Sequence, residues 1–210
     1  MTTRALLVAL MEPSSSREDE FNDWYDLEHL PTMAAVPGIE TAARFLAVEG
    51  WPRHLAIYDL AEFAVLRSPA YRALTGSGFT PWSRRNLGMV RGWQRLTFVQ
   101  SSGGGTLDPR CGALLMATFS GTPDVRAAAA ALAARPGVLQ ARAFGPGEET
   151  GEGAALVVEA GALAALPSLS ALVEATTVAD SAALLSFSAR YVRYTRVDPF
   201  ARFHDLESQS

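Results

Sequence analysis

Ala-Leu-Leu-Val-Ala at residues 5–9 recurs as Ala-Leu-Leu-Met-Ala at residues 113–117, about half a chain later. Two further stretches return at a similar separation: Pro-Gly-Ile at 37–39 as Pro-Gly-Val at 136–138, and Arg-Leu-Thr at 95–97 as Arg-Tyr-Thr at 193–195. Self-similarity at a fixed period indicates a duplicated structural unit. The 210-residue sequence therefore predicts two copies of one supersecondary pattern.

Each copy has the order strand, helix, strand, strand, helix, strand, which is that of a ferredoxin-like unit. The predicted strands are 4–11, 39–48, 53–60 and 90–99, then 112–119, 138–144, 154–160 and 185–197, and the predicted helices are 16–34, 62–75, 122–135 and 162–175. The opening strand of each copy is apolar on both faces, so each sheet needs a cover on the side away from its helices. We expect an α+β fold, with tandem ferredoxin-like βαββαβ repeats packed sheet to sheet as an intramolecular α+β barrel.

The predicted domain organisation follows the repeat. Residues 1–100 form the first unit and contain the candidate site, and residues 112–197 form a degenerate second unit. Residues 101–111 begin with Ser-Ser-Gly-Gly-Gly, a composition typical of a flexible linker. Residues 198–210 form a polar tail.

Composition narrows the class of protein. About half of the residues (49%) are hydrophobic, enough for a sizeable core, and the net charge of −4 argues against a nucleic-acid partner. The sequence contains no secretion signal and no membrane-spanning run, and its single cysteine, Cys111, suits a reducing compartment. We therefore expect a soluble cytoplasmic protein, either a monomer with pseudo-twofold symmetry or a homodimer. The absence of lysine excludes Schiff-base and P-loop chemistry.

The two copies differ in their chemical side chains. All four tryptophans lie in the first copy, whereas the second is rich in alanine. The distance from the first strand to the Pro-Gly turn is also longer in the first copy, 32 residues from Ala5 to Pro37 against 23 from Ala113 to Pro136. The additional residues fall in the first helix and its exit, so this segment is the candidate site.

Wound at 3.6 residues per turn, this helix has an apolar face of Phe21, Trp24, Tyr25 and Leu27. Glu28 falls within that face and His29 at its edge. A carboxylate on an apolar face must be paired, hydrogen-bonded or protonated, and an imidazole at a pocket edge titrates near neutrality. The pair is therefore a candidate for proton transfer. In the structural alternatives, Glu28 pairs with Arg44 or Arg95, and His29 caps the helix end.

The run Phe21-x-x-Trp24-Tyr25-x-x-Glu28-His29-Leu30-Pro31, followed by Val-Pro-Gly at 36–38 and Arg-Phe at 44–45, resembles the EthD-like branch of the dimeric α+β barrel superfamily. The resemblance implies two ferredoxin-like units forming a barrel, usually from separate chains, here fused. Related proteins include cofactor-free monooxygenases, polyketide cyclases and muconolactone-type isomerases. It also implies that His29 lines the pocket, and the second copy has no counterpart.

These observations predict a cofactor-independent enzyme that cyclises, isomerises or dehydrates a hydrophobic, aromatic or polyketide-like molecule. We expect His29 to be the general acid/base, Glu28 to orient it and Arg44 to stabilise an enolate or carboxylate. The expected substrate-binding residues are Trp24, Tyr25, Arg44, Trp82 and Trp93. Trp82 could instead fix its loop to the surface, and Trp93 could serve barrel closure first. The alternatives are a non-catalytic small-molecule binding protein and a monooxygenase on the same fold.

No metal or nucleotide cofactor is expected. The sequence has no HxH or CxxC motif and no glycine-rich phosphate loop, and His29 is poorly spaced from nearby carboxylates for one metal. Haem would need only one axial histidine, so the sequence excludes it less firmly. Of the other histidines, His54 opens a strand and is expected on the surface, and His204 lies in the tail.

Overall fold

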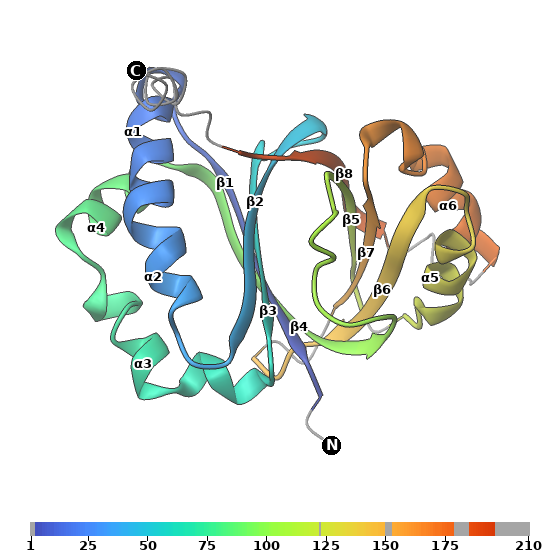
Figure 1. Ribbon diagram of the computed structural model, residues 1–210, viewed down its shortest axis with the longest axis horizontal. Coiled ribbons are helices and arrows are strands. Elements are labelled where there is room, and N and C mark those ends of the chain that lie inside the picture. The colour runs from blue at the N-terminus through green and yellow to red at the C-terminus, as the bar shows by residue number, and fades with distance from the viewer. Residues whose placement is uncertain (1–2, 122, 150–152, 179–184, 196–210) are drawn as a thin grey trace, which may run out of the picture.

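The computed structural model describes residues 3–121, 123–149, 153–178 and 185–195 (Figure 1). The strands are β1 (Ala5–Glu12), β2 (Ile39–Glu49), β3 (His54–Leu60), β4 (Arg91–Ser102), β5 (Ala113–Phe119), β6 (Val138–Pro146), β7 (Ala154–Ala160) and β8 (Leu185–Arg193). The helical segments are η1 (Ser15–Arg17), α1 (Glu18–Trp24), η2 (Tyr25–His29), α2 (Leu30–Ala34), η3 (Phe63–Arg67), α3 (Pro69–Arg72), η4 (Gly76–Gly78), α4 (Pro81–Leu87), α5 (Arg126–Ala133), η5 (Leu163–Ala165) and α6 (Leu169–Val178). The tail at 198–210, with His204, and residues 196–197 of the predicted last strand lie outside the described residues.

The strands form one closed antiparallel barrel in the order β1-β3-β2-β8-β5-β7-β6-β4, with β4 returning to β1. Within each repeat the two central strands are the first and third, as in a ferredoxin-like sheet. The two sheets join at two seams, where β2 pairs with β8 and β4 pairs with β6. The predicted fold class, tandem ferredoxin-like repeats packed into one α+β barrel, is confirmed.

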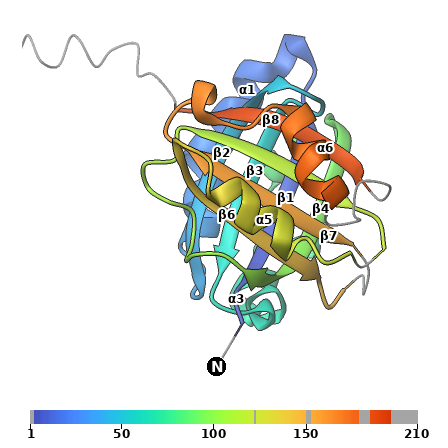
Figure 2. The ribbon, with the colours of Figure 1, turned by 90° about the vertical axis from the view of Figure 1, so that its right-hand side faces the viewer.

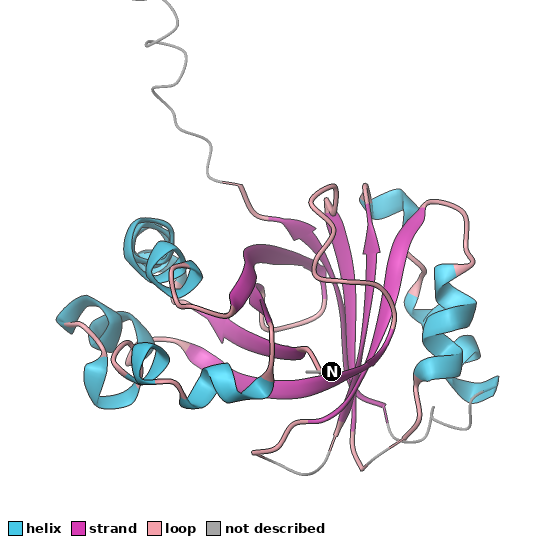
Figure 3. Cartoon of the chain, turned by 60° about the horizontal axis from the view of Figure 1, so that its bottom comes forward, coloured by secondary structure: helices cyan, strands magenta, loops and turns pink. Residues whose placement is uncertain are grey.

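The helices cover the outer faces of the two sheets. In Figure 1, α1 to α4 lie beside the first sheet and α5 and α6 beside the second, and Figures 2 and 3 show the same layering from other sides. Alternate side chains of β1 divide between the layers: Leu6, Val8 and Leu10 pack inside the barrel, and Leu7 and Met11 pack under the helices. This burial on both faces explains why the opening strands are apolar at successive positions and not only at alternate ones.

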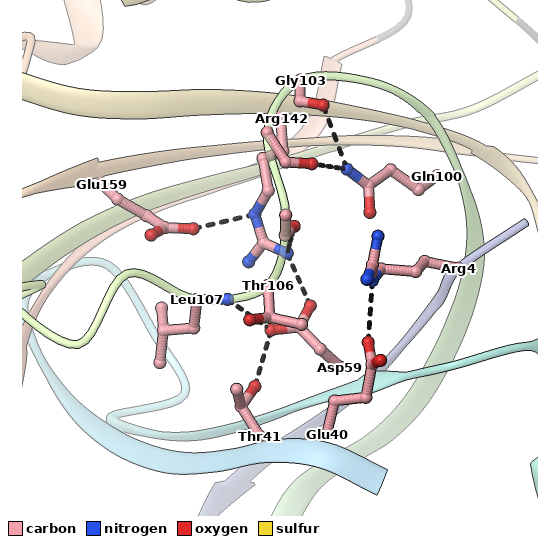
Figure 4. Close-up of polar contacts among 12 residues, drawn as sticks. Arg4, Glu40, Thr41, Asp59, Gln100, Gly103, Thr106, Leu107, Arg142 and Glu159 are labelled. Carbon is pink, nitrogen blue, oxygen red and sulfur yellow. Dashed lines mark hydrogen bonds and ion pairs between the residues drawn. The ribbon is translucent and has the colours of Figure 1, made fainter. Parts of the chain in front are cut away.

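A buried ion-pair network ties the two repeats together inside the barrel (Figure 4). Arg142 Nη1 donates to Asp59 Oδ1 at 2.5 Å, and Arg142 Nε donates to Glu159 Oε1 at 2.8 Å. All three side chains are at most 1% exposed. Burial raises the pKa of Glu159, against the lowering effect of Arg142. Because Asp59 belongs to the first repeat and Arg142 to the second, the network links both sheets.

The segment expected to be a flexible linker is fixed by this network. β4 continues through Ser102, and beyond it the backbone N–H groups of Leu107 and Asp108 donate to Asp59 and Glu159, at 2.7 and 2.8 Å. The Leu107 side chain is buried in the barrel core. The glycine-rich composition suggested flexibility, but the buried carboxylates accept these backbone donors and hold the segment against the barrel.

The predicted helix at 16–34 forms with a change of winding in its middle, because η2 is a π-helical turn. The predicted helix at 62–75 is broken into η3, α3 and η4, and residues 81–87, expected to be a loop, form α4. Within the described residues, no helix is both long enough and apolar enough to cross a membrane.

Candidate functional site

The π-helical turn decides which side chain of the first helix faces inward. Leu30 N–H donates to Tyr25 C=O, a hydrogen bond that spans five residues. In a regular α-helix, residues five apart point about 140° away from each other. Here Trp24 and His29 are five apart yet stack, with ring centroids 4.7 Å apart and planes 26° apart. The extra residue per turn therefore brings His29 over Trp24, into the layer between helix and sheet.

The same turn corrects the predicted apolar face. Phe21, Trp24 and Tyr25 are buried as expected, but Leu27 is 65% exposed. Regular winding placed Glu28 within the face and His29 at its edge. The π-turn rotates the downstream residues, so that His29 contacts both Trp24 and Tyr25, the Tyr25 ring lying perpendicular at 5.0 Å.

A cavity of about 380 Å³ lies between the first sheet and its helices. Its lining is mostly apolar and aromatic, and the residues come from β1, β3, β4, the helical layer and one loop of the second repeat. They are Leu7, Ala9, Met11, Tyr25, His29, Met33, Tyr58, Leu66, Tyr71, Thr75, Gly76, Phe79, Leu87, Trp93, Arg95 and Glu149. This volume is in the range of small-molecule sites.

His29 is the candidate reactive group of this cavity. It makes no hydrogen bond to any described residue, and it also lines a smaller adjoining cavity of about 30 Å³. Burial lowers the pKa of His29 to about 4, with Glu28 raising it and Arg44 lowering it further. The imidazole is therefore neutral at pH 7, and its nitrogen lone pair can accept a proton or a hydrogen bond from a ligand.

Glu28 lies behind His29, in a polar chain that supports Trp24. Glu28 Oε1 accepts hydrogen bonds from Thr80 Oγ1 at 2.6 Å and from Ser83 Oγ at 3.1 Å. Ser83 Oγ in turn accepts from Trp24 Nε1 at 3.1 Å. Neither Arg44 nor Arg95, the partners considered from the sequence, contacts this carboxylate among the hydrogen bonds and ion pairs of the described residues. Glu28 thus fixes the indole on which His29 stacks.

Arg44 does not line the cavity, contrary to its expected role beside a substrate anion. Its guanidinium donates to Asp26 Oδ1 at 2.5 Å and to Asn22 Oδ1 at 2.7 Å, and it lies 4.5 Å from the centre of the Tyr25 ring. These contacts hold the first helix to β2. His54 is part of the same cluster and only 3% exposed, so its expected surface position is wrong. Burial, followed by Arg44, lowers the pKa of His54 to about 4.

Of the four aromatic residues predicted to bind substrate, two line the cavity and two do not. Tyr25 and Trp93 line the cavity, and Trp93 is 54% exposed at that position. Trp24 is fully buried behind His29, and Trp82 packs on the apolar cluster between helices and sheet, so neither lines the cavity. The Tyr25 and Tyr58 hydroxyls are 3.3 Å apart, and burial raises the pKa of Tyr25 to about 12.

The cavity also contains a charged pair, Arg95 and Glu149, of which sequence reasoning missed Glu149 and took Arg95 as barrel-closing structure before pocket wall. Arg95 Nη1 donates to Glu149 Oε2 at 2.5 Å, and Arg95 Nε and Nη2 contact Tyr71 Oη at 3.4 and 3.3 Å. Arg95 alternates with Trp93 along β4, so both lie on one face, a signal that the sequence does contain. Nothing in the sequence indicates that Glu149, from the loop after β6, reaches the first repeat.

Comparisons with known proteins find similarity in structure alone. No protein family model and no curated protein sequence matches. An anthrone oxidase-like protein has 13% identity and a TM-score of 0.64, over 93% of this chain and 92% of the other. A putative monooxygenase from Lactobacillus acidophilus has 9% identity and a TM-score of 0.55, over 92% of this chain and 95% of the other. A heme-binding protein from Thermus thermophilus has 9% identity and a TM-score of 0.58, over 99% of this chain and 96% of the other. Chlorite dismutases are also among the similar structures.

These comparisons correct the functional prediction. Proteins that share the fold over more than nine-tenths of both chains are named for oxidative or haem-related functions. The expectation of cofactor-independent cyclisation, isomerisation or dehydration is therefore wrong, and the alternative of a monooxygenase on this fold agrees better with them.

The cavity residues do not fit a haem group. His29 offers a neutral imidazole of the kind that ligates haem iron. Haem also carries two carboxylates, and Arg95 is the one arginine or lysine among the described lining residues. A single guanidinium leaves the second carboxylate without a cationic partner among the described lining residues. Separately, no group of three or more potential metal ligands occurs among the described residues.

Proposed function

We propose that this protein is an oxygen-using enzyme, of the monooxygenase or oxidase type, that acts on an aromatic small molecule in the cavity beside His29. The observation that carries the proposal is His29 itself, a neutral imidazole without a hydrogen-bond partner among the described residues, on the wall of a largely apolar cavity. The shared fold with an anthrone oxidase-like protein and a monooxygenase supports oxidative chemistry over the corrected alternatives.

The proposed reaction converts an activated ring CH₂ group and O₂ into a ring carbonyl and water. His29 removes one proton from the CH₂ carbon, and the resulting electron-rich anion donates its electrons to O₂. One oxygen atom stays on the carbon, which loses its second hydrogen, and the other oxygen leaves as water with the two hydrogens. The substrate supplies the electrons, so the balance needs no further reductant.

The low pKa of His29 fits this sequence of events. A histidine with a pKa of about 4 is a weak base in the empty cavity, because burial penalises the imidazolium. A substrate anion beside it compensates that penalty, since opposite charges in contact favour the charged form. Proton transfer is thus coupled to formation of the anion, which keeps the proton close for its return to the departing oxygen.

The other predicted site residues have supporting roles in this proposal. Glu28 is a positioning residue, acting through Ser83 and Trp24 on the His29 ring. Tyr25 and Trp93 form walls of the cavity. Arg44 holds the first helix on the sheet, and Trp82 packs α4 in place, so both act on the shape of the site without touching the substrate.

Replacement of His29 tests the proposal. The wild type is expected to consume O₂ with at least one member of a panel of anthrones, each of which carries an activated ring CH₂ group. His29→Asn should lower that rate by about 100- to 10,000-fold, the usual contribution of an acid/base group, while ligand affinity changes only a few-fold. Oxygen-electrode rates and calorimetric titrations measure the two effects.

His54→Asn is the matched control, because His54 is a second buried histidine that does not line the cavity. It should keep most of the oxidation rate. No oxygen consumption with any panel member, or an undiminished rate in His29→Asn, would contradict the proposal. A Soret band in the purified protein would contradict a haem-free mechanism.

We also infer that the chain arose by fusion of two units of the EthD-like type, 1–100 and 112–197, joined by 101–111. The equivalent positions of Asp59 and Glu159, each next to last in its strand, support the duplication. The lone cysteine supports a reducing compartment such as the cytoplasm.

A further inference from the structure

An ion pair at the cavity joins the two repeats. Arg95 lies on β4 of the first repeat, and Glu149 lies on the loop after β6 of the second. Their side chains are 28% and 36% exposed, so the pair lies at the opening of the cavity and not in the core. The second repeat, whose sequence has no counterpart of His29, thereby contributes a side chain to the cavity of the first.

The loop that carries Glu149 packs closely on β4. A Cβ atom at Gly147 would lie 2.4 Å from the carbonyl oxygen of Thr97, so only glycine allows this approach. Glu148 forms a second ion pair from the same loop, with Arg67 Nη1 at 2.9 Å, but both side chains are more than half exposed. The close approach at Gly147 thus holds the loop against β4, which places the Glu149 side chain beside Arg95.

Glu149 accepts a hydrogen bond from only one of the guanidinium nitrogens of Arg95. One carboxylate oxygen, Oε2, accepts from Arg95 Nη1, and the same oxygen is 3.4 Å from Thr97 Oγ1. A guanidinium can give a carboxylate two parallel hydrogen bonds, which are stronger and more specific than one. An anionic group that enters from the cavity can therefore replace Glu149 on Arg95 and gain a bond in the exchange.

The surroundings of Arg95 suit an aromatic ligand. Trp93 lies two residues before it on the same face of β4, and Tyr71 Oη holds its Nε edge. A flat ring system against Trp93 would place a substituent beside the guanidinium of Arg95. His29 lines the helical side of the same cavity.

We propose that Arg95 is the anion-binding group of this cavity, and that it takes the carboxylate or phenolate oxygen of an aromatic ligand in place of Glu149. The inference rests on the proposed function, since it names the substrate class of that site as an acidic aromatic compound. Glu149 holds Arg95 in position when no ligand is bound, and it disfavours ligands that cannot replace its charge.

Two probes of similar shape test the inference by isothermal titration calorimetry: 2-naphthoate, an anion, and 2-acetylnaphthalene, which is neutral. Arg95→Gln should weaken 2-naphthoate binding by at least about tenfold, the value of a hydrogen bond to a charged group. Glu149→Gln should tighten it by about two- to fivefold, because a partly exposed ion pair no longer competes. Affinity for 2-acetylnaphthalene should change less than twofold in both.

Arg67→Gln is the matched control, because it removes the ion pair of Glu148 on the same loop and leaves the cavity lining intact. It should leave the affinity for both probes unchanged. The inference is overturned if Arg95→Gln weakens both probes equally or neither, or if Glu149→Gln leaves 2-naphthoate binding unchanged. A wild type that binds neither probe would contradict the proposed function as well, whereas binding of the neutral probe without selectivity for the anion overturns the inference alone.

Discussion

His29 and His54 are the two imidazoles that the first repeat removes from water. The pKa of each is lowered to about 4, in both cases chiefly by burial. They differ in their neighbours: His54 contacts Arg44 and Glu18, whereas His29 stacks on Trp24 and has no hydrogen bond within the described part of the chain. An unpartnered imidazole beside a cavity is available to a ligand, which is why His29 and not His54 is the candidate reactive group.

Both histidines should make the fold less stable in weak acid. In the unfolded chain a histidine has a pKa near 6.5, so below that pH the unfolded state binds protons that the folded state does not take up until about pH 4. The free energy of unfolding should therefore fall between pH 7 and pH 5, by on the order of 1 kcal/mol per histidine. Urea unfolding at the two pH values measures it. His54→Asn and His29→Asn should each reduce the dependence, and a wild-type value that is flat over this window would contradict the lowered pKa values.

At the scale of single residues, the sequence predicted His29 and Tyr25 better than Arg44. The placement of His29 beside the cavity agrees with its aromatic neighbours and with the family resemblance. Arg44 lies outside the cavity lining because its guanidinium is bound to Asp26 and Asn22, and no sequence pattern indicates those contacts. Glu149 could not be found at all, since its contact crosses between repeats.

At the scale of elements, the strands followed from the repeat and from their apolar pattern, and their bounds agree to within a few residues. The π-turn did not follow, because no residue type marks a hydrogen bond that spans five residues. Its effect is large: it replaces Glu28 by His29 next to Trp24 and leaves Leu27 in solvent. π-Turns are often found at functional sites, where one extra residue redirects a side chain.

Deletion of Leu27 tests this account of the turn. Without that exposed residue, Trp24 and His29 are four apart, which is one turn of an α-helix. The deletion variant should fold, with a circular dichroism spectrum like that of the wild type and a melting temperature within a few degrees of it, and it should still bind the cavity probes. Deletion of the buried Tyr25 is the contrasting variant and should unfold the protein or lower its melting temperature far more. Equal damage from both deletions would contradict the role given to the π-turn.

At the scale of the whole molecule, the barrel depends on one arginine between two carboxylates. Arg142 is fully buried with Asp59 and Glu159, so removing its charge leaves two carboxylates without their shared partner. Composition could not reveal this cluster, because its members are far apart in sequence. Its two carboxylates also accept the backbone N–H groups of Leu107 and Asp108, which holds the segment between the repeats against the barrel.

Arg142→Met should therefore destabilise the protein by about 3–5 kcal/mol, the usual effect of breaking a buried ion pair. Combining it with Asp59→Asn and Glu159→Gln should restore much of the loss, because the uncompensated charges are then gone. Arg110→Met, which breaks an ion pair with Asp108 through an arginine side chain that is 73% exposed, should lower stability by less than about 1 kcal/mol. Urea unfolding at pH 7 compares them. An Arg142→Met effect as small as that of Arg110→Met would contradict the role of the network.

The two seams, β2 with β8 and β4 with β6, close the ring of strands within a single polypeptide. A ring assembled from separate chains comes apart on dilution, because subunit association obeys mass action. Here the covalent connection removes that dependence, so the ring keeps its closure however scarce the protein is in the cell. The same covalent link keeps Glu149 of the second repeat beside Arg95 of the first at any protein concentration.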